Sequence, residues 1–134
     1  MKAVYPTILT KDGKTILVEV PDLGILTEGK NMQDAIYMAR DAIGSTGISM
    51  QDHGEAIPEP SDIGDINVSK GTFADVGEGI KTLVDIDFDA YRKTMDRKMV
   101  RRNVTLPSWM DARAAAEHIN VSKVLQEALM QKFA

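Results

Sequence analysis

The sequence predicts an α+β protein with two domains, residues 1–95 and residues 96–134. Period-two strand patterns and one amphipathic helix fill the first part, whereas one extended segment and two helical patterns fill the second. The charge divides at the same place. Residues 1–95 hold nine Lys or Arg against sixteen acids and residues 96–134 hold seven against four, so −7 and +3 give the net charge of −4. This division predicts two surfaces with different partners, and only the basic tail suits a polyanion.

The composition indicates a folded protein, because 43% of the residues are hydrophobic and 27% are charged. No apolar run is long enough to span a membrane and the opening residues lack a signal-peptide pattern, so we expect a cytoplasmic protein. There is no cysteine, and neither His53 nor His118 lies in a metal-ligand or nucleophile motif. We therefore expect no metal, no cofactor and no membrane association.

Strands are expected at four places in the first domain. Each place is rich in Val, Ile, Leu or Thr, and the predicted ranges are residues 3–9, 15–20, 23–27 and 82–88. Asp12-Gly13 is a strong signal for a hairpin between the first two, because glycine reaches positive φ without strain. Residues 65–79 stay open between an extra strand and a glycine-rich loop.

One helix follows the third strand, and Asn31 is placed to cap its first turn. Its apolar residues recur at spacings of three and four, which is typical of a helix packed on a sheet: Met32, Ala35, Ile36, Ala39 and Ile43. Gly44 and Gly47 are expected to end this helix. A short helix with an acidic start is expected over residues 87–95.

The tail begins with an extended segment of alternating character at residues 100–107. Val100, Val104 and Leu106 share one face, and hydrogen-bonding side chains occupy the other. A single strand leaves its backbone edges unpaired, so we expect it to pair with the same strand of a second chain. The tail therefore predicts an obligate two-fold dimer.

Two helical patterns complete the tail. Pro107 stops the strand and Ser108 is the expected N-cap of the first helix, whereas Asn120 breaks that helix and Ser122 is the expected N-cap of the last. The apolar side chains of strand and helices are predicted to form the dimer core: Val104, Leu106, Trp109, Val124, Leu125 and Leu129.

The order strand, helix, turn, helix resembles the ribbon-helix-helix DNA-binding module, above all in the run Arg101–Pro107 followed by Ser122–Leu129. The resemblance implies a two-stranded ribbon in the major groove of palindromic operator DNA. The face opposite the apolar one carries side chains that can read base edges, and the predicted readers are Arg101, Asn103 and Thr105. The predicted phosphate contacts are Lys98, Arg102, Ser122 and Lys123.

The whole chain resembles the HicB family of antitoxins. The resemblance rests on the order of elements, Pro21-Asp22-Leu23, the Thr27-Glu28-Gly29 turn, the loop Ile57–Pro60 and the tail. It implies a partial ribonuclease-H-like β-β-β-α-β domain that binds a HicA-type mRNA-cleaving toxin, and a β-α-α tail that represses the operon as a homodimer or a dimer of dimers. Candidate toxin contacts are Tyr5, Asp22, Leu23 and Glu28.

The sequence departs from the family pattern in two places. Gly24-Ile25-Leu26 stands where many members have a Pro-Gly-Cys-like turn, and residues 65–79 form a longer segment than usual. Both departures fall in the first domain, so the surface that would contact a toxin is the part least well defined by the resemblance.

A ribonuclease-H-like fold also suggests a nuclease, whose chemistry needs clustered carboxylates around two metal ions. Residues 3–9 contain no acid, and turns or helix starts account for the acids elsewhere. We therefore predict no catalytic residues and no enzyme activity. Two other functions stay open: a ligand-responsive ribbon-helix-helix repressor whose N-terminal domain senses a small molecule, and a metal-dependent nuclease.

Overall fold

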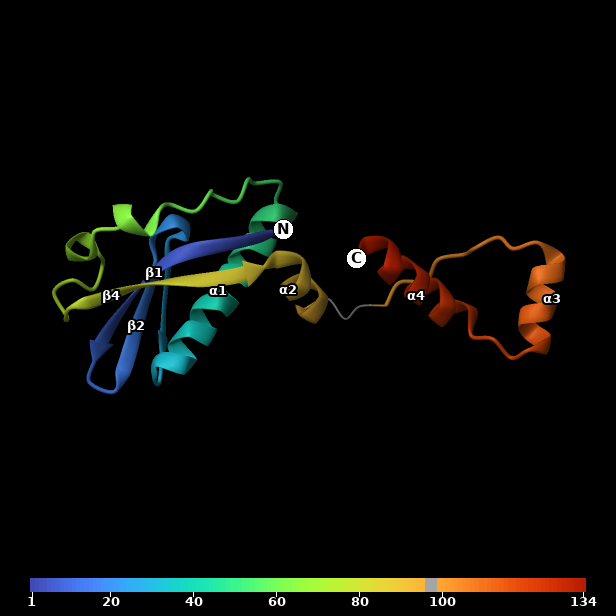
Figure 1. Ribbon diagram of the computed structural model, residues 1–134, viewed down its shortest axis with the longest axis horizontal. Coiled ribbons are helices and arrows are strands. Elements are labelled where there is room, and N and C mark those ends of the chain that lie inside the picture. The colour runs from blue at the N-terminus through green and yellow to red at the C-terminus, as the bar shows by residue number, and fades with distance from the viewer. Residues whose placement is uncertain (96–98) are drawn as a thin grey trace. The chain divides into compact units, whose positions relative to one another are not determined.

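The computed structural model describes residues 1–95 and 99–134 and contains two compact units, Met1–Arg97 and Lys98–Ala134 (Figure 1). The described residues form a four-stranded antiparallel sheet and four α-helices, which is an α+β fold. The front unit follows the predicted order β-β-β-α-β.

The strands are β1 (Lys2–Asp12), β2 (Thr15–Val20), β3 (Ile25–Gly29) and β4 (Gly79–Asp87), arranged in the order β3-β2-β1-β4. The hairpin predicted at Asp12-Gly13 is confirmed, and Gly13 has a φ of 61°. The third strand begins at Ile25 and not at the predicted residue 23. The reason is a 3₁₀ turn over Pro21–Leu23, which Gly24 closes with a left-handed φ of 62°.

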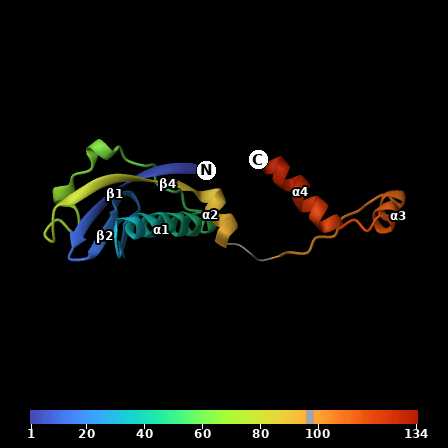
Figure 2. The same ribbon diagram turned by 60° about the horizontal axis from the view of Figure 1, so that its bottom comes forward.

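Helix α1 (Met32–Asp52) lies along one face of the sheet, as Figure 2 shows. The predicted cap is confirmed, because the Asn31 side chain accepts a hydrogen bond from the Asp34 N–H at 2.8 Å. The predicted end at Gly44 and Gly47 is wrong, since the helix continues to Asp52. These two glycines instead give room to aromatic rings from the following helix.

Helix α2 (Phe88–Met95) packs on α1 through those rings. A Cβ at Gly44 would lie 2.6 Å from the Tyr91 ring, and one at Gly47 would overlap the Phe88 ring. The Tyr91 hydroxyl donates to Asp41 Oδ1 at 2.9 Å. Burial, together with this bond, raises the pKa of Tyr91 to about 12.

The core of the front unit lies between α1 and the sheet. Its buried side chains come from both layers: Tyr5, Leu9, Ile16, Val18, Val20, Ile25, Ala35, Ala39, Ile43, Val84, Ile86 and Phe88. The apolar stripe predicted on the helix supplies Ala35, Ala39 and Ile43 of this set. Alternate residues of each strand therefore face α1, as the pleat of a strand requires.

The segment between α1 and β4 covers part of the opposite face of the sheet. It contains two 3₁₀ turns, Ile63–Asp65 and Val68–Lys70, and no strand among residues 65–78, so the loop alternative holds there. Side chains of the sheet hold it in place. Lys81 Nζ donates to the carbonyls of Ile63 and Ile66 at 3.1 and 3.2 Å, and Glu19 Oε1 accepts from the Thr72 N–H at 2.9 Å.

The tail unit contains α3 (Ser108–Ala116) and α4 (Val121–Phe133). Residues 100–107 form no strand, contrary to the prediction, because the single chain offers no second strand with which to pair. Two predicted caps are also wrong. Ser108 is the first residue of α3, and the cap of α4 is Asn120, whose side chain accepts from the Lys123 N–H at 3.1 Å. Ser122 lies inside the first turn of α4.

Candidate protein and nucleic-acid interfaces

The tail unit has no core of its own. Among residues 99–134 none is buried, and only Leu106, Ala114 and Val121 are half-buried. Trp109 is 64% exposed, and the other predicted core residues that lie in the open are Val104, Val124, Leu125 and Leu129. Full burial of one such side chain contributes about 1.5–3 kcal/mol of stability. Covering several of these side chains with a partner would therefore stabilise the tail unit strongly.

An apolar hollow of about 240 Å³ opens between α3, α4 and the extended segment. The side chains that line it are Leu106, Met110, Ala114, Ile119, Val121 and Val124, with Arg113 and Glu117 beside them. Arg113 Nε and Glu117 Oε2 form an ion pair of 3.4 Å, which places charge at the border of the hollow. A hollow of this composition suits apolar side chains of another chain.

The predicted base readers Arg101, Asn103 and Thr105 all lie exposed in the extended segment that precedes α3. Arg102 is exposed in the same segment, whereas Lys98 lies outside the described residues. Ser122 and Lys123 are exposed in the first turn of α4, where the helix dipole is positive. These side chains are therefore available to a polyanion.

The four candidate toxin contacts have different surroundings. Tyr5 is 0% exposed and its hydroxyl donates to the Pro58 carbonyl at 2.7 Å, so it offers a partner no side-chain surface. Burial raises the pKa of Tyr5 above that of a free tyrosine. Leu23 is half-buried against the core, and Glu28 is the one exposed residue of the four.

Asp22 anchors the loop that follows α1. Its carboxylate accepts the Ser61 N–H at 2.8 Å and the Ser61 hydroxyl at 2.6 Å. Tyr5 and Asp22 thus fix the segment Pro58–Ser61 against the sheet from neighbouring points. The shape of this surface therefore depends on two of the predicted residues.

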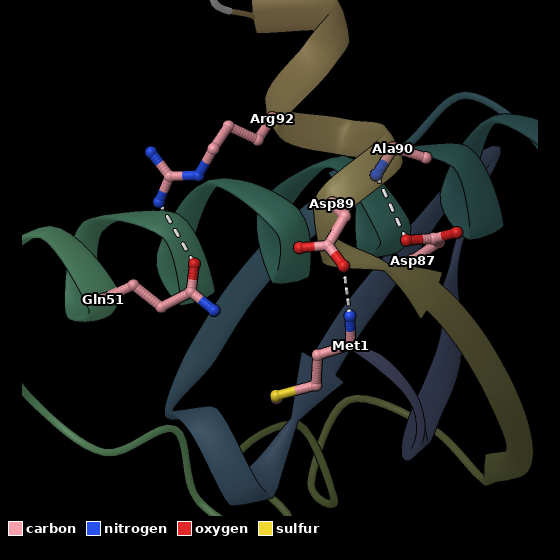
Figure 3. A network of polar contacts seen from close by, with 6 residues as sticks. All are labelled: Met1, Gln51, Asp87, Asp89, Ala90 and Arg92. Carbon is pink, nitrogen blue, oxygen red and sulfur yellow. Dashed lines mark hydrogen bonds and ion pairs between the residues drawn. The ribbon is translucent and has the colours of Figure 1, made fainter. Parts of the chain in front are cut away.

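A polar network ties α2 to its surroundings (Figure 3). The Met1 ammonium group pairs with Asp89 at 2.5 Å, and this hydrogen bond lowers the pKa of the Asp89 carboxyl. Asp87 Oδ1 caps the helix by accepting the Ala90 N–H at 3.1 Å, and Arg92 Nη2 donates to Gln51 Oε1 at 3.1 Å. All of these groups are exposed to solvent, so each pair fixes the orientation of α2 more than it stabilises the fold.

The comparisons with known proteins agree with this arrangement. A family model described as the HicB-like antitoxin of bacterial toxin–antitoxin systems matches residues 5–129. The chain belongs to this antitoxin family. The predicted family is therefore confirmed, and the coarse role of the protein is that of an antitoxin.

Two solved structures resemble the antitoxin over nearly its whole length. A chain of a toxin–antitoxin complex from Streptococcus pneumoniae has a TM-score of 0.63 and 22% identity, with 98% of this chain and 99% of that chain covered. The antitoxin HicB of Burkholderia pseudomallei has a TM-score of 0.53 and 27% identity, with 98% and 96% covered. The search of curated proteins finds no match.

Membership of an antitoxin family indicates a regulatory, non-enzymatic protein. Across residues 1–95 and 99–134, no cluster of three or more His, Asp or Glu side chains could hold a metal ion. None of the helices described in this antitoxin has the length and apolarity needed to cross a membrane.

Sequence reasoning missed Arg40 and Lys81 of the antitoxin. Arg40 reaches from α1 to β4, where Nε donates to the Asp85 carbonyl at 3.0 Å and Nη2 pairs with Asp85 Oδ1 at 3.0 Å. Arg40 fits the polar face of a predicted helix and Lys81 the end of a loop, so nothing local distinguishes either from a solvated residue. Only the packing of α1 on the sheet brings Arg40 to β4, and only the packing of the loop brings the carbonyls of Ile63 and Ile66 to Lys81.

Proposed function

We propose that this antitoxin neutralises a HicA-type mRNA-cleaving toxin through residues 1–95 and represses its own operon through paired tails, residues 96–134. The observation that carries the proposal is the tail unit, which exposes its apolar side chains and its extended segment together. A unit of this kind gains stability only when a partner covers it.

The partner best suited to the tail is a second copy of the same tail. Val100, Val104 and Leu106 alternate with polar residues, so two copies of residues 100–107 can pair antiparallel with their apolar faces on the same side. Those faces would then cover the hollow that α3 and α4 leave open. The ribbon-helix-helix arrangement arises in this way from dimerisation and not within one chain.

The paired ribbon would present Arg101, Asn103 and Thr105 on its outer face in two symmetric sets. Arginine can grip guanine through two hydrogen bonds, asparagine can grip adenine, and threonine can bond to a base or touch a thymine methyl. Lys98, Arg102, Ser122 and Lys123 would hold the phosphates on either side. Two-fold symmetry of the ribbon requires a palindromic operator.

The front unit supports the toxin-binding half of the proposal by its charge. Residues 1–95 carry a charge of −7, and an RNA-cleaving toxin needs a basic surface for its substrate. Opposite charges speed association and favour the correct orientation of the two proteins. Glu28, exposed on the edge strand β3, is the strongest of the four candidate contacts, and neutralisation requires only that the basic surface be covered.

Co-expression with the toxin encoded beside this gene tests the proposal. The wild type should rescue growth, purify as a complex with the toxin, and shift an operator fragment in a gel. Trp109→Asp should abolish the shift, because a charge in the tail core prevents pairing, while the purified variant still binds toxin. Loss of toxin binding in this variant, or an unchanged gel shift, would contradict the division of labour between the two units.

A matched control comes from Lys132→Ala. It removes an exposed cation from the last turn of α4, outside both the reading segment and the apolar hollow, so its operator affinity should stay close to that of the wild type. Comparison with Arg101→Ala then separates a base contact from a general loss of positive charge.

A further inference from the structure

The two faces of the front sheet are covered by different kinds of structure. Helix α1 packs on one face and α2 packs on α1, whereas the irregular segment of residues 54–78 covers part of the other face (Figure 2). The second face, here named the open face, consists of this segment and of the strand side chains that point away from α1. No α-helix of residues 1–95 packs on it.

The negative charge of the front unit comes from the strands and the segment, and not from the helices. Residues 30–53 and 88–95, which contain both helices, hold four Lys or Arg against four acids and are neutral. The other residues of 1–95 hold five against twelve, which is the whole charge of −7. The segment alone holds one lysine against six acids, which gives −5: Glu55, Glu59, Asp62, Asp65, Asp75 and Glu78. A basic protein is therefore attracted to the open face and not to the helices.

The six carboxylates of the segment are exposed and available to a partner. Within residues 1–95 and 99–134 none of them forms an ion pair, and only Asp62 accepts a hydrogen bond, from the Gly64 N–H at 2.8 Å. The backbone that carries them is nevertheless held in place. Side chains of the sheet and of the turn after β2 bind it at Pro58, Ser61, Ile63, Ile66 and Thr72. A partner would therefore meet carboxylates whose backbone is already ordered, which lowers the entropic cost of binding.

Uncovered apolar side chains belong to the same face. Leu26 lies opposite Glu19 and Leu83 lies opposite Pro6, and both alternate with buried residues that face α1. Leu26 is 55% exposed on β3 and Leu83 is 52% exposed on β4, so one lies at each edge of the sheet. The open face thus combines apolar side chains with a strongly acidic segment, as a contact surface for a basic protein requires.

We propose that the toxin binds to the open face, and that the carboxylates of residues 54–78 pair with the basic groups by which the toxin binds RNA. This inference rests on the proposed function and adds the face and its chemistry. Cations placed to bind phosphates can form charge-assisted hydrogen bonds with carboxylates as well. Leu26 and Leu83 would add apolar contacts on either side of the segment, and α1 and α2 would stay outside the contact.

The proposal implies that the antitoxin inhibits by taking the place of the RNA. A toxin surface whose cations are paired with carboxylates cannot hold phosphates at the same time. RNA and antitoxin should therefore compete for the toxin, and excess antitoxin should release a bound 2′-O-methyl RNA oligonucleotide from it.

Two double variants with the same change in net charge test the face. Asp65→Asn with Asp75→Asn removes two negative charges from the segment, whereas Gln33→Lys with Ser45→Lys adds two positive charges at exposed positions of α1. The full-length proteins are titrated with purified toxin at 0.1 M salt. The dissociation constant should rise about tenfold for the first pair and less than about twofold for the second, because charges beyond a screening length of about 10 Å have little effect.

A second comparison tests the apolar part of the face. Leu26→Ser removes an exposed apolar side chain from the open face, and Tyr37→Ser removes one that is 62% exposed on α1. Leu26→Ser should weaken toxin binding about fivefold, because half of a leucine side chain loses its cover in the complex. Tyr37→Ser should bind as the wild type does. Circular dichroism and urea midpoints of all variants monitor folding.

The other outcomes are equally decisive. Weaker binding by the α1 variants, with no change for the segment and Leu26 variants, would place the toxin on the helices and overturn the inference while the proposed function stands. Equal weakening by the two charge pairs would show that net charge alone attracts the toxin, which also overturns it. A ternary complex of toxin, antitoxin and oligonucleotide would exclude competition with RNA. A wild type that does not bind the toxin at all would overturn the proposed function and this inference with it.

Discussion

Replacing Gly47 by alanine sets two effects against each other inside α1. Alanine favours a helix by about 1 kcal/mol relative to glycine, so propensity alone predicts a more stable front unit. The added Cβ, however, would lie 2.8 Å from Cδ1 and 2.9 Å from Cζ of the Phe88 ring, and closer still to Cε1. Phe88 is fully buried and cannot turn away, so overpacking costs about 1–3 kcal/mol and decides the sign.

A cost in the middle of that range, less the gain in helix propensity, leaves a net loss of about 1 kcal/mol of unfolding free energy for Gly47→Ala, which lowers the urea midpoint by roughly 0.5 M. Far-ultraviolet circular dichroism follows this transition, whereas the fluorescence of Trp109, the only tryptophan, reports on the tail and should keep its midpoint. The control is Ser45→Ala, an exposed position on the same helix that should gain a few tenths of a kcal/mol. A Gly47→Ala protein as stable as the control would refute the packing argument.

Three other measurements test the remaining parts of the structure. Arg101→Ala or Asn103→Ala should weaken operator binding by about 1–3 kcal/mol per lost base contact in gel-shift titrations, with toxin affinity unchanged. Asn120→Ala should cost about 1 kcal/mol in the unfolding transition seen by Trp109 fluorescence, and Ser122→Ala much less, because only Asn120 caps α4. The raised pKa of Tyr91 favours its neutral form in the folded state, so thermal melts should show stability lost between the ordinary tyrosine pKa and about 12, and less steeply in Tyr91→Phe.

Local patterns in the sequence were sufficient for most of the front unit. Strand alternation, the turn at Asp12-Gly13 and the cap at Asn31 each depend on residues close together in the chain, so these predictions are confirmed. Gly44 and Gly47 show where local reasoning fails. A glycine in a helical pattern indicates an end unless a distant side chain needs the space, and the rings that need it come from α2, about forty residues later.

The candidate sites were harder to predict because they depend on contacts that sequence patterns do not show. Tyr5 fits the period-two pattern of its strand. That pattern does not show that the Tyr5 hydroxyl binds a loop carbonyl or that the ring lies in the core. Ser and Asn both cap helices well, so the choice between Ser122 and Asn120 depends on which side chain reaches a free N–H. The predicted strand at residues 100–107 requires a partner outside the chain, so no single-chain structure can contain it.

Both units have a stretch of extended backbone with an unpaired edge, and the difference between the two stretches predicts how the antitoxin binds its partners. Residues 100–107 have neither a strand partner nor a covering side chain among the described residues, and the apolar surface beside them is large. On β4, by contrast, Arg40 covers the outward carbonyl of Asp85 and Lys81 is engaged with the loop, so the isolated front unit is already folded and satisfied. A contact that completes an unfinished core is obligate, whereas one that replaces existing weak bonds is conditional. The tails should therefore pair at any concentration at which the protein is folded, whereas any strand that binds the edge of β4 must first displace Arg40 from the Asp85 carbonyl, so its binding should depend on concentration and salt.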